Sequence, residues 1–92
     1  MNKIQMHKEI CDNLTEIYIA KNHDYGDSFG IGYKEYGSLM AVIRLEDKFS
    51  RYKTLCKHDS KVKDESVKDT LIDLANYAIM TIMEIEEKEI QK

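Results

Sequence analysis

Apolar residues recur every three or four positions along most of the chain, which is the spacing of one face of an α-helix. The pattern predicts three main helices, over about residues 2–21, 39–57 and 64–89. No stretch shows the strict alternation of apolar and polar residues that marks a half-buried strand. The sequence therefore predicts an all-α fold, a compact antiparallel helical bundle.

The first predicted helix has one apolar side, made by Ile4, Ile10, Cys11, Leu14, Ile17 and Tyr18. His7 lies on the same side, where a histidine is more often a packed core group than a ligand.

Residues 21–37 hold all four glycines of the protein. Glycine adopts the positive-φ conformations that end helices and form turns, so this stretch is predicted to be a long loop or lid. Ser38 is a suitable N-cap for the helix that follows it.

The second predicted helix carries a carboxylate in the middle of its apolar face. That face consists of Leu39, Val42, Ile43, Leu45, Phe49 and Cys56, and Glu46 lies among them. A carboxylate removed from water needs a cation, a cluster of donors or a proton. Asp47 points elsewhere and is expected to form surface ion pairs with Arg44 and Arg51.

The third predicted helix carries an acidic ridge of Glu65, Asp69 and Asp73, which follow one another at intervals of four residues. Like charges at this spacing destabilise a helix unless something compensates them. The ridge continues into Asn76, Tyr77 and Met80, so Asp73 is expected where the ridge enters the interior. The opposite side holds the apolar residues Val67, Leu71, Leu74, Ala78 and Ile85.

Two interpretations of these acids remain open. If the second and third helices pack antiparallel, Glu46 comes opposite Asp69 and Asp73, and Mg²⁺ can bridge the carboxylates to a polyphosphate. Alternatively, the ridge is neutralised by salt bridges from Arg44, Lys48, Arg51 or Lys53.

Length and charge add to this picture. A chain of 92 residues makes one domain, 1–92, and buries only about two-thirds of its unfolded surface. The apolar run 74–83 exceeds what two partner helices cover, so we expect a dimer or higher homo-oligomer. Residues 44–63 hold seven Lys/Arg and three Asp/Glu, and residues 64–92 hold three and eight. A basic segment next to an acidic one favours either of two interpretations: a phosphorylated ligand held through a divalent cation, or two helix faces that attract each other. Neither segment is basic enough to indicate binding of duplex DNA.

The chain shows no sign of export or of membrane insertion. The first ten residues lack the apolar run of a signal peptide, and the longest uncharged run is about half of a membrane span. Cys11 and Cys56 lie far apart, which favours reduced, packed thiols. We expect a cytoplasmic protein.

Three segments, KNHDYGDSF, AVIRLEDKFSR and KDESVKDTLIDLANYAIM, occur in this order. Together they resemble the nucleotide modification associated domain 1 family, small proteins of phages and Gram-positive bacteria. The resemblance covers roughly residues 20–85. It implies a nucleotide-binding or nucleotide-processing domain in a bacterial or phage-infected cell.

A more distant similarity is to the all-α nucleoside triphosphate pyrophosphatases, the MazG and dimeric dUTPase group. Those enzymes hold Mg²⁺ through E-x-x-E on one helix and E-x-x-D on the next. Here EDKFS at 46–50 matches the first motif with Ser50 replacing its last glutamate, and DTLID at 69–73 is one residue longer than the second. The similarity implies that binding survives these departures more easily than two-metal hydrolysis does.

Under this similarity, site residues are assigned as follows. Glu46, Asp69, Asp73 and Glu65 would ligate Mg²⁺, with Glu46 and Glu65 as the catalytic residues and Glu65 as the alternative general base. Lys48, Arg51 and Lys53 would offset phosphate charge, and Asn76 and Tyr77 would touch base or sugar. The loop residues His23, Asp24, Tyr25, Gly26 and Asp27 would close over the ligand. For that loop a helix stop followed by a side-chain-capped turn is the alternative.

Three functions follow from these patterns. The first is Mg²⁺-dependent hydrolysis or binding of a (deoxy)nucleoside polyphosphate, as in a pyrophosphohydrolase. The second is a non-catalytic phage sponge that sequesters a host-defence signalling nucleotide. The third is a structural helical adaptor whose acids pair with Lys and Arg.

Overall fold

The computed structural model describes residues 2–57 and 63–90, and the side chains of 2–57 and 67–90. It contains four helices, α1 (Lys3–Tyr25), α2 (Ser28–Tyr36), α3 (Ser38–Lys57) and α4 (Lys63–Ile90). The described ranges contain no strand, so the predicted all-α class is confirmed. The three predicted helices are present, and α2 is an additional one.

The first helix begins where the sequence predicts but ends one turn later. The side chain of Asn2 caps it by accepting hydrogen bonds from the backbone N–H of Ile4 (2.9 Å) and of Gln5 (3.3 Å). The helix continues to Tyr25 and is ended by Gly26, whose φ of 66° is a conformation that glycine adopts without strain.

The prediction of a long loop over residues 21–37 is wrong, because most of this stretch is helical. Two of its glycines end helices, as expected, since Gly26 and Gly37 both have positive φ. The other two lie inside α2, although each glycine costs a helix about 1 kcal/mol. Burial of Phe29 and the capping hydrogen bond from Gly30 N to Asp27 Oδ1 (3.2 Å) offset this cost.

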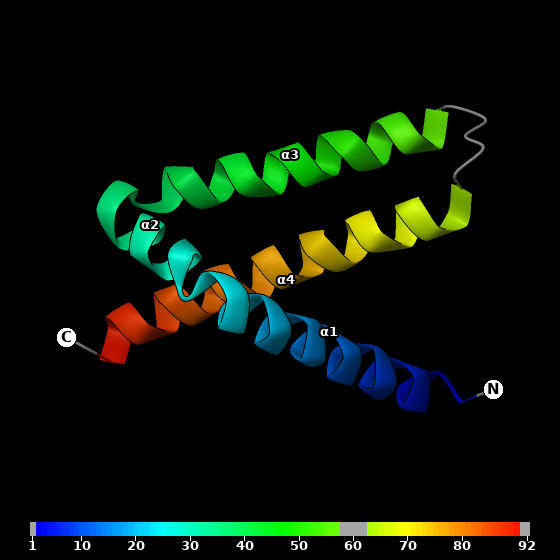
Figure 1. Cartoon of the computed structure of the whole chain (residues 1–92), viewed down its shortest axis with the longest axis horizontal. Coiled ribbons are helices and arrows are strands. Elements are labelled where there is room, and N and C mark those ends of the chain that lie inside the picture. Colours follow the sequence, from blue (N-terminus) through cyan, green and yellow to red (C-terminus); the bar gives the residue numbers. More distant parts are fainter. Residues whose placement is uncertain (1, 58–62, 91–92) are drawn as a thin grey trace.

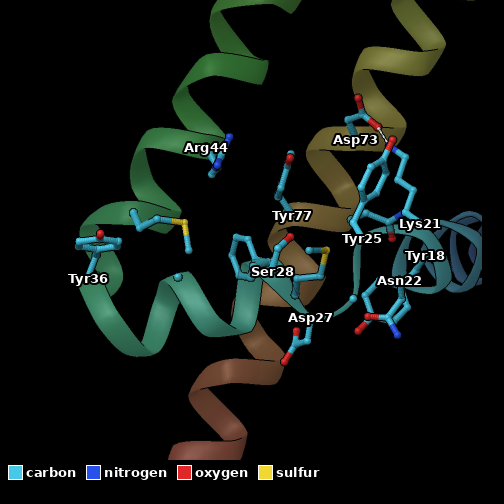
Figure 2. Close-up of a pocket in the computed structure, with 16 residues that line it drawn as sticks. Tyr18, Lys21, Asn22, Tyr25, Asp27, Ser28, Tyr36, Arg44, Asp73 and Tyr77 are labelled. Carbon is cyan, nitrogen blue, oxygen red and sulfur yellow. Dashed lines mark hydrogen bonds and ion pairs between the residues drawn. The ribbon is translucent and has the colours of Figure 1, made fainter.

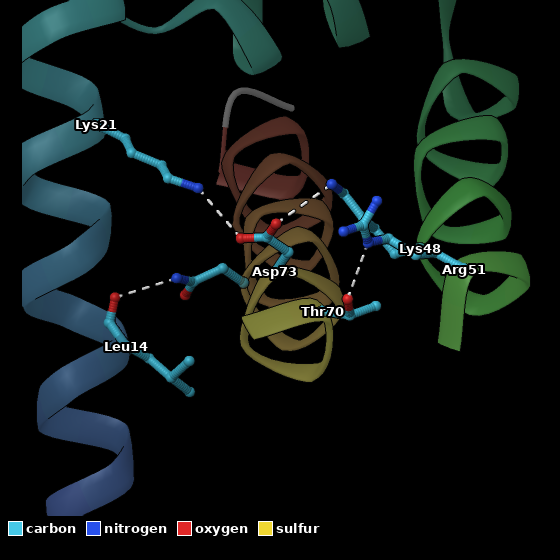
Figure 3. A network of polar contacts seen from close by, with 7 residues as sticks. Leu14, Lys21, Lys48, Arg51, Thr70 and Asp73 are labelled. Carbon is cyan, nitrogen blue, oxygen red and sulfur yellow. Dashed lines mark hydrogen bonds and ion pairs between the residues drawn. The ribbon is translucent and has the colours of Figure 1, made fainter. Parts of the chain in front are cut away.

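Helices α3 and α4 run side by side and antiparallel, and α1 crosses α4 (Figure 1). Figure 3 shows α4 between α1 and α3. The short α2 joins the end of α1 to the start of α3 and packs against both α3 and α4. Among the described residues only Leu14, Phe29 and Ala41 are buried apolar side chains, so the core is small.

Apart from Leu45, the apolar face predicted on α3 does not face α4. Val42 and Phe49 are 50% and 49% exposed, and Glu46 between them is exposed too. The prediction that Glu46 lies on a buried face is therefore wrong. The more covered positions on α3 are Met40, Ala41, Leu45, Lys48, Tyr52 and Leu55. Polar contacts between Lys48 and α4 select this second face, because they take hydrogen-bonding groups out of water in pairs.

From Asp73 on, the ridge predicted on α4 does point inward, since Asp73, Asn76, Tyr77 and Met80 are half-buried. Asp69 is exposed, and the side chain of Glu65 lies outside the described residues. Of the apolar residues predicted on the opposite side, Leu71, Ala78 and Ile85 are exposed, and Val67 and Leu74 are half-buried. The α3–α4 contact is therefore more polar than helix periodicity alone suggests.

Two smaller expectations are also corrected. His7 and both cysteines are exposed instead of packed, although Cys11 and Cys56 are free thiols as expected. The Sγ atom of Cys11 lies 3.6 Å from Nδ1 of His7 one helical turn away. None of the helices in the described part of the chain is long and apolar enough to cross a membrane.

Candidate functional site

A cavity of about 300 Å³ lies where the end of α1, all of α2, the start of α3 and the middle of α4 meet (Figure 2). Its walls are formed by Tyr18, Lys21, Asn22, Tyr25, Gly26, Asp27, Ser28, Phe29, Gly32, Tyr36, Met40, Arg44, Asp73, Asn76, Tyr77 and Met80. The volume is at the lower end of the range of about 300–1,000 Å³ for small-molecule sites. The cavity therefore suits one compact group better than a polymer.

Aromatic rings make up much of the wall. The ring of Phe29 lies 5.7 Å from that of Tyr77, and this contact fastens α2 to α4. Tyr25 and Tyr36 also line the cavity, yet they are 73% and 70% exposed. Their ring faces are thus open to a flat partner that enters the cavity.

An acid held between two lysines stands at one side of the cavity. Asp73 Oδ1 is 3.1 Å from Nζ of Lys21 on α1, and its Oδ2 is 3.2 Å from Nζ of Lys48 on α3 (Figure 3). Lys48 Nζ also lies 6.0 Å from the centre of the Tyr77 ring. Arg44 contributes a further cation to the wall. Counting Asp27, which also lines the cavity, the three cations Lys21, Lys48 and Arg44 stand against two carboxylates, so the site carries a small positive balance.

The two lysines also determine how Asp73 titrates. Burial alone would raise the pKa of Asp73, but the hydrogen bonds and charges of Lys21 and Lys48 outweigh it and lower the pKa. Asp73 is therefore ionised at neutral pH. Because its folded-state pKa lies below the ordinary value, these contacts add stability at neutral pH that is lost as the pH falls through the lowered pKa.

Two further polar contacts hold the three long helices in place around the cavity. The amide Nδ2 of Asn76 donates to the backbone carbonyl of Leu14 on α1, at 3.2 Å. Nε of Arg51 on α3 donates to Oγ1 of Thr70 at 3.2 Å. Arg51 thus lies toward the far end of the α3–α4 pair and stabilises the helix pairing.

Several residues assigned from the sequence do come together at this site. Tyr25, Gly26, Asp27, Asn76 and Tyr77 all line the cavity, and Lys48 reaches its edge through Asp73. This holds even though the predicted loop is largely helical.

Other assigned residues lie elsewhere. His23 and Asp24 are exposed, and His23 Nδ1 lies 3.2 Å from Asp24 Oδ1. Lys53 extends over the ring of Phe49, 5.1 Å from its centre, on the exposed side of α3. Asp47 forms no ion pair with Arg44 or Arg51 among the described side chains, so that prediction is wrong.

The four acids assigned to Mg²⁺ are not brought together as one cluster. Glu46 and Asp69 are exposed, whereas Asp73 faces the two lysines. The side chain of Glu65 lies outside the described residues. Within the described ranges no three His, Cys, Asp or Glu side chains are grouped closely enough to hold a metal ion. Metal binding by this set stays a prediction, with Asp73 as the member that lies at the cavity.

Ten wall residues were not assigned from the sequence, namely Tyr18, Lys21, Asn22, Ser28, Phe29, Gly32, Tyr36, Met40, Arg44 and Met80. The first three belong to the last turns of α1, which the sequence pattern ends too early. The clustering of Tyr18, Tyr25 and Tyr36 among six tyrosines of the chain was the available signal, since exposed aromatic residues often mark binding sites.

A second acidic side chain, Glu84 on α4, is 7% exposed and lies near α2. Burial raises its pKa, and the neighbouring carboxylates of Glu87 and Asp27 raise it further, whereas Lys34 lowers it. Lys34 Nζ is 3.8 Å from Oε1 of Glu87, so Lys34 is shared between the two acids. The ionised form of Glu84 therefore destabilises the folded chain.

Glu84→Gln is expected to raise the melting temperature at pH 7 by about 5 °C, the shift that about 1 kcal/mol produces in a domain of this size. With a folded-state pKa above the ordinary one, the wild type loses stability as the pH rises through the interval between the two values, and the variant does not. Thermal denaturation followed by circular dichroism from pH 4 to pH 8 measures this. Glu89→Gln, which changes an exposed acid on the same helix, should change little. A less stable Glu84→Gln at pH 7 would contradict the prediction.

No curated protein and no solved structure matches the chain, and the similarity to the MazG and dimeric dUTPase group stays a prediction. The family described as nucleotide modification associated domain 1 does match, over residues 21–85. The matched range includes the end of α1, all of α2 and α3, and most of α4, so it contains every wall residue of the cavity except Tyr18. With more than half of its length matched, the chain belongs to the nucleotide modification associated domain 1 family.

Proposed function

We propose that this protein binds a (deoxy)nucleoside polyphosphate, with the base in the aromatic cavity and the phosphates against Lys21, Lys48 and Arg44. The observation that carries the proposal is the composition of one cavity, with aromatic walls beside a cluster of cations. A nucleotide has the same two parts, a flat base and an anionic chain. Membership of a nucleotide modification associated family supports the same ligand class.

The base would enter beside Tyr77 and between the exposed rings of Tyr25 and Tyr36. Stacking of a base on an aromatic side chain contributes about 1–3 kcal/mol. Asn22, Ser28 and Asp27 supply polar atoms on the same wall, which can bond to base or sugar. Nδ2 of Asn76 is already used by Leu14, so Asn76 would serve mainly to hold α1 against the cavity.

The phosphates would compete with Asp73 for the two lysines. Charge-assisted contacts of Lys and Arg with phosphate oxygens are stronger than neutral hydrogen bonds. When phosphate takes over Lys21 and Lys48, the carboxylate of Asp73 becomes free to hold a Mg²⁺ ion that arrives with the nucleotide. Mg²⁺ would then bridge Asp73 and the phosphates, and hydrolysis would be possible only if further acids approach that ion.

Asp73→Asn tests this arrangement. Without Mg²⁺ the variant should bind nucleoside triphosphates about tenfold more tightly than the wild type, because the competing carboxylate is gone and two ammonium groups are released. With Mg²⁺ its affinity should not increase further. Isothermal titration calorimetry of both proteins, in EDTA and in Mg²⁺, measures the two effects. Weaker binding of the variant in EDTA would contradict the competition.

A thermal-shift and turnover panel separates binding from hydrolysis. The purified protein is offered (deoxy)nucleoside triphosphates and cyclic nucleotides, each with and without Mg²⁺. Mg²⁺-dependent pyrophosphate release that Asp73→Asn abolishes would identify a pyrophosphohydrolase. Stabilisation without turnover would identify a binding protein, such as the sponge. If no nucleotide raises the melting temperature of either protein, the proposed function is wrong.

A further inference from the structure

The α3–α4 pair has one face that no described residue of this chain covers. On α3 this face carries Val42 and Phe49, and on α4 it carries Leu71 and Ile85, all of them exposed. These positions belong to the apolar faces that the sequence pattern predicts to be buried. Large apolar side chains that recur at helical spacing on a continuous surface mark an interaction site.

Helix geometry shows that the apolar positions of both helices lie on the same side of the pair. On α3, Phe49 lies to one side of the line that faces α4, and Arg44, at the cavity, lies to the other. On α4, Ile85 lies to one side of the line that faces α3, and Asn76, which contacts α1, lies to the other. Because α3 and α4 are antiparallel, the two apolar sides coincide. The cavity, α1 and α2 lie on the opposite side.

We propose that a second copy of this chain covers this face, with α3 of each copy packed antiparallel on α3 of the other about a two-fold axis. The positions of the charges along α3 favour a second copy of the chain as the partner. Glu46 and Lys53 flank the apolar stripe, both are exposed, and neither forms an ion pair among the described side chains. They lie at equal distances along the chain from the midpoint between Phe49 and Ser50. Antiparallel pairing about that midpoint brings each Glu46 opposite the Lys53 of the other copy.

An exposed apolar residue of α4 lies at the same level. Lys48 contacts Asp73 at 3.2 Å and Arg51 contacts Thr70 at 3.2 Å, so the midpoint of the α3 pattern lies beside residues 71–72. Leu71 is exposed at that level. One two-fold axis therefore brings the Leu71 side chains of the two copies near each other on α4 and pairs acid with base on α3, as an isologous interface requires. Apolar contact supplies the affinity, and the ion pairs set the register.

The experiment is a charge exchange read by analytical ultracentrifugation of the full chain. We expect a wild-type dimer, which Phe49→Glu converts to monomer. Glu46→Lys and Lys53→Glu should each raise the dimer dissociation constant about tenfold, because each creates two like-charge contacts by symmetry. The double variant, with both charges exchanged, should return to the wild-type value. Glu35→Lys, on α2, makes the same charge change outside the face and should leave the dimer intact.

Three results would overturn the proposal. If the wild type is a monomer at a protein concentration of the order of 100 μM, the chain does not form the proposed dimer. If Phe49→Glu still forms a dimer, the interface is not this face of the α3–α4 pair. If the single charge variants dissociate and the double variant does not restore the dimer, the two copies of α3 do not pair in the proposed antiparallel register. Because the cavity lies on the other side of the pair, nucleotide binding by the wild type remains measurable in each case, and the two proposals can fail separately.

Discussion

Lys48→Ala is expected to weaken nucleoside triphosphate binding by about thirtyfold. A charge-assisted hydrogen bond contributes about 1.5–3 kcal/mol, and about 2 kcal/mol corresponds to a factor of thirty. The variant also removes the cation next to the Tyr77 ring and leaves Asp73 paired with Lys21 alone among the described side chains, at 3.1 Å. The carboxylate then repels the incoming phosphates more strongly. Isothermal titration calorimetry at fixed ionic strength measures the change.

Lys34→Ala is the matched control, because it removes the same charge from an exposed lysine outside the cavity. Lys34 pairs with Glu87 at 3.8 Å and lies on the Glu84 side of α2. Its binding constant should stay within about twofold of the wild type, as expected for a distant charge that salt screens. Equal losses in Lys34→Ala and Lys48→Ala would show that the nucleotide responds to net charge and not to the cavity.

Leu14→Ala is expected to lower the free energy of unfolding by about 3 kcal/mol and the melting temperature by about 15 °C. Leu14 is 6% exposed and is the one buried apolar side chain that α1 contributes within the described residues. The backbone carbonyl of Leu14 also accepts the hydrogen bond from Asn76, so a looser α1 weakens two contacts together. Chemical denaturation followed by circular dichroism measures the loss.

Ile10→Ala serves as the control for this variant. Ile10 lies on the same helix and has the same size class of side chain, but it is exposed. Its truncation should cost no more than about 0.5 kcal/mol, as is usual for surface substitutions. A loss in Ile10→Ala as large as that in Leu14→Ala would mean that the outer side of α1 is also covered in solution. Leu14→Ala should further weaken nucleotide binding, because α1 supplies Lys21 and Tyr25 to the cavity.

The long helices were predictable because their information is local. Helical periodicity, the N-cap at Asn2 and the helix-ending glycines at 26 and 37 each act within a few residues. The missing helix, α2, shows the limit of such reasoning. Its glycines argue for a loop, and the burial of Phe29 against Tyr77 on α4, together with the Asp27 cap, makes the helix favourable.

The candidate site was predictable in part for the same reason. The ridge that runs from Asp73 to Asn76 and Tyr77 follows from one helix alone, and all three residues reach the cavity. Lys21 and Arg44 come from other helices, and their side chains meet the ridge only through packing. The burial of Glu46 was predicted wrongly because an apolar stripe does not indicate which element covers it.

By itself, then, the sequence determined the helical class, three of the helices and the inward direction of the Asp73 ridge, because these depend on contacts within a turn or two of chain. Only the tertiary structure decided which face of α3 meets α4. The face that packs on α4 holds Ala41, Leu45, Tyr52 and Leu55 and also Lys48, which pairs with Asp73 at 3.2 Å, while the stripe of Val42 and Phe49 remains exposed. In the proposed dimer a second copy buries that apolar face, and helical periodicity cannot distinguish such contacts from contacts within one chain.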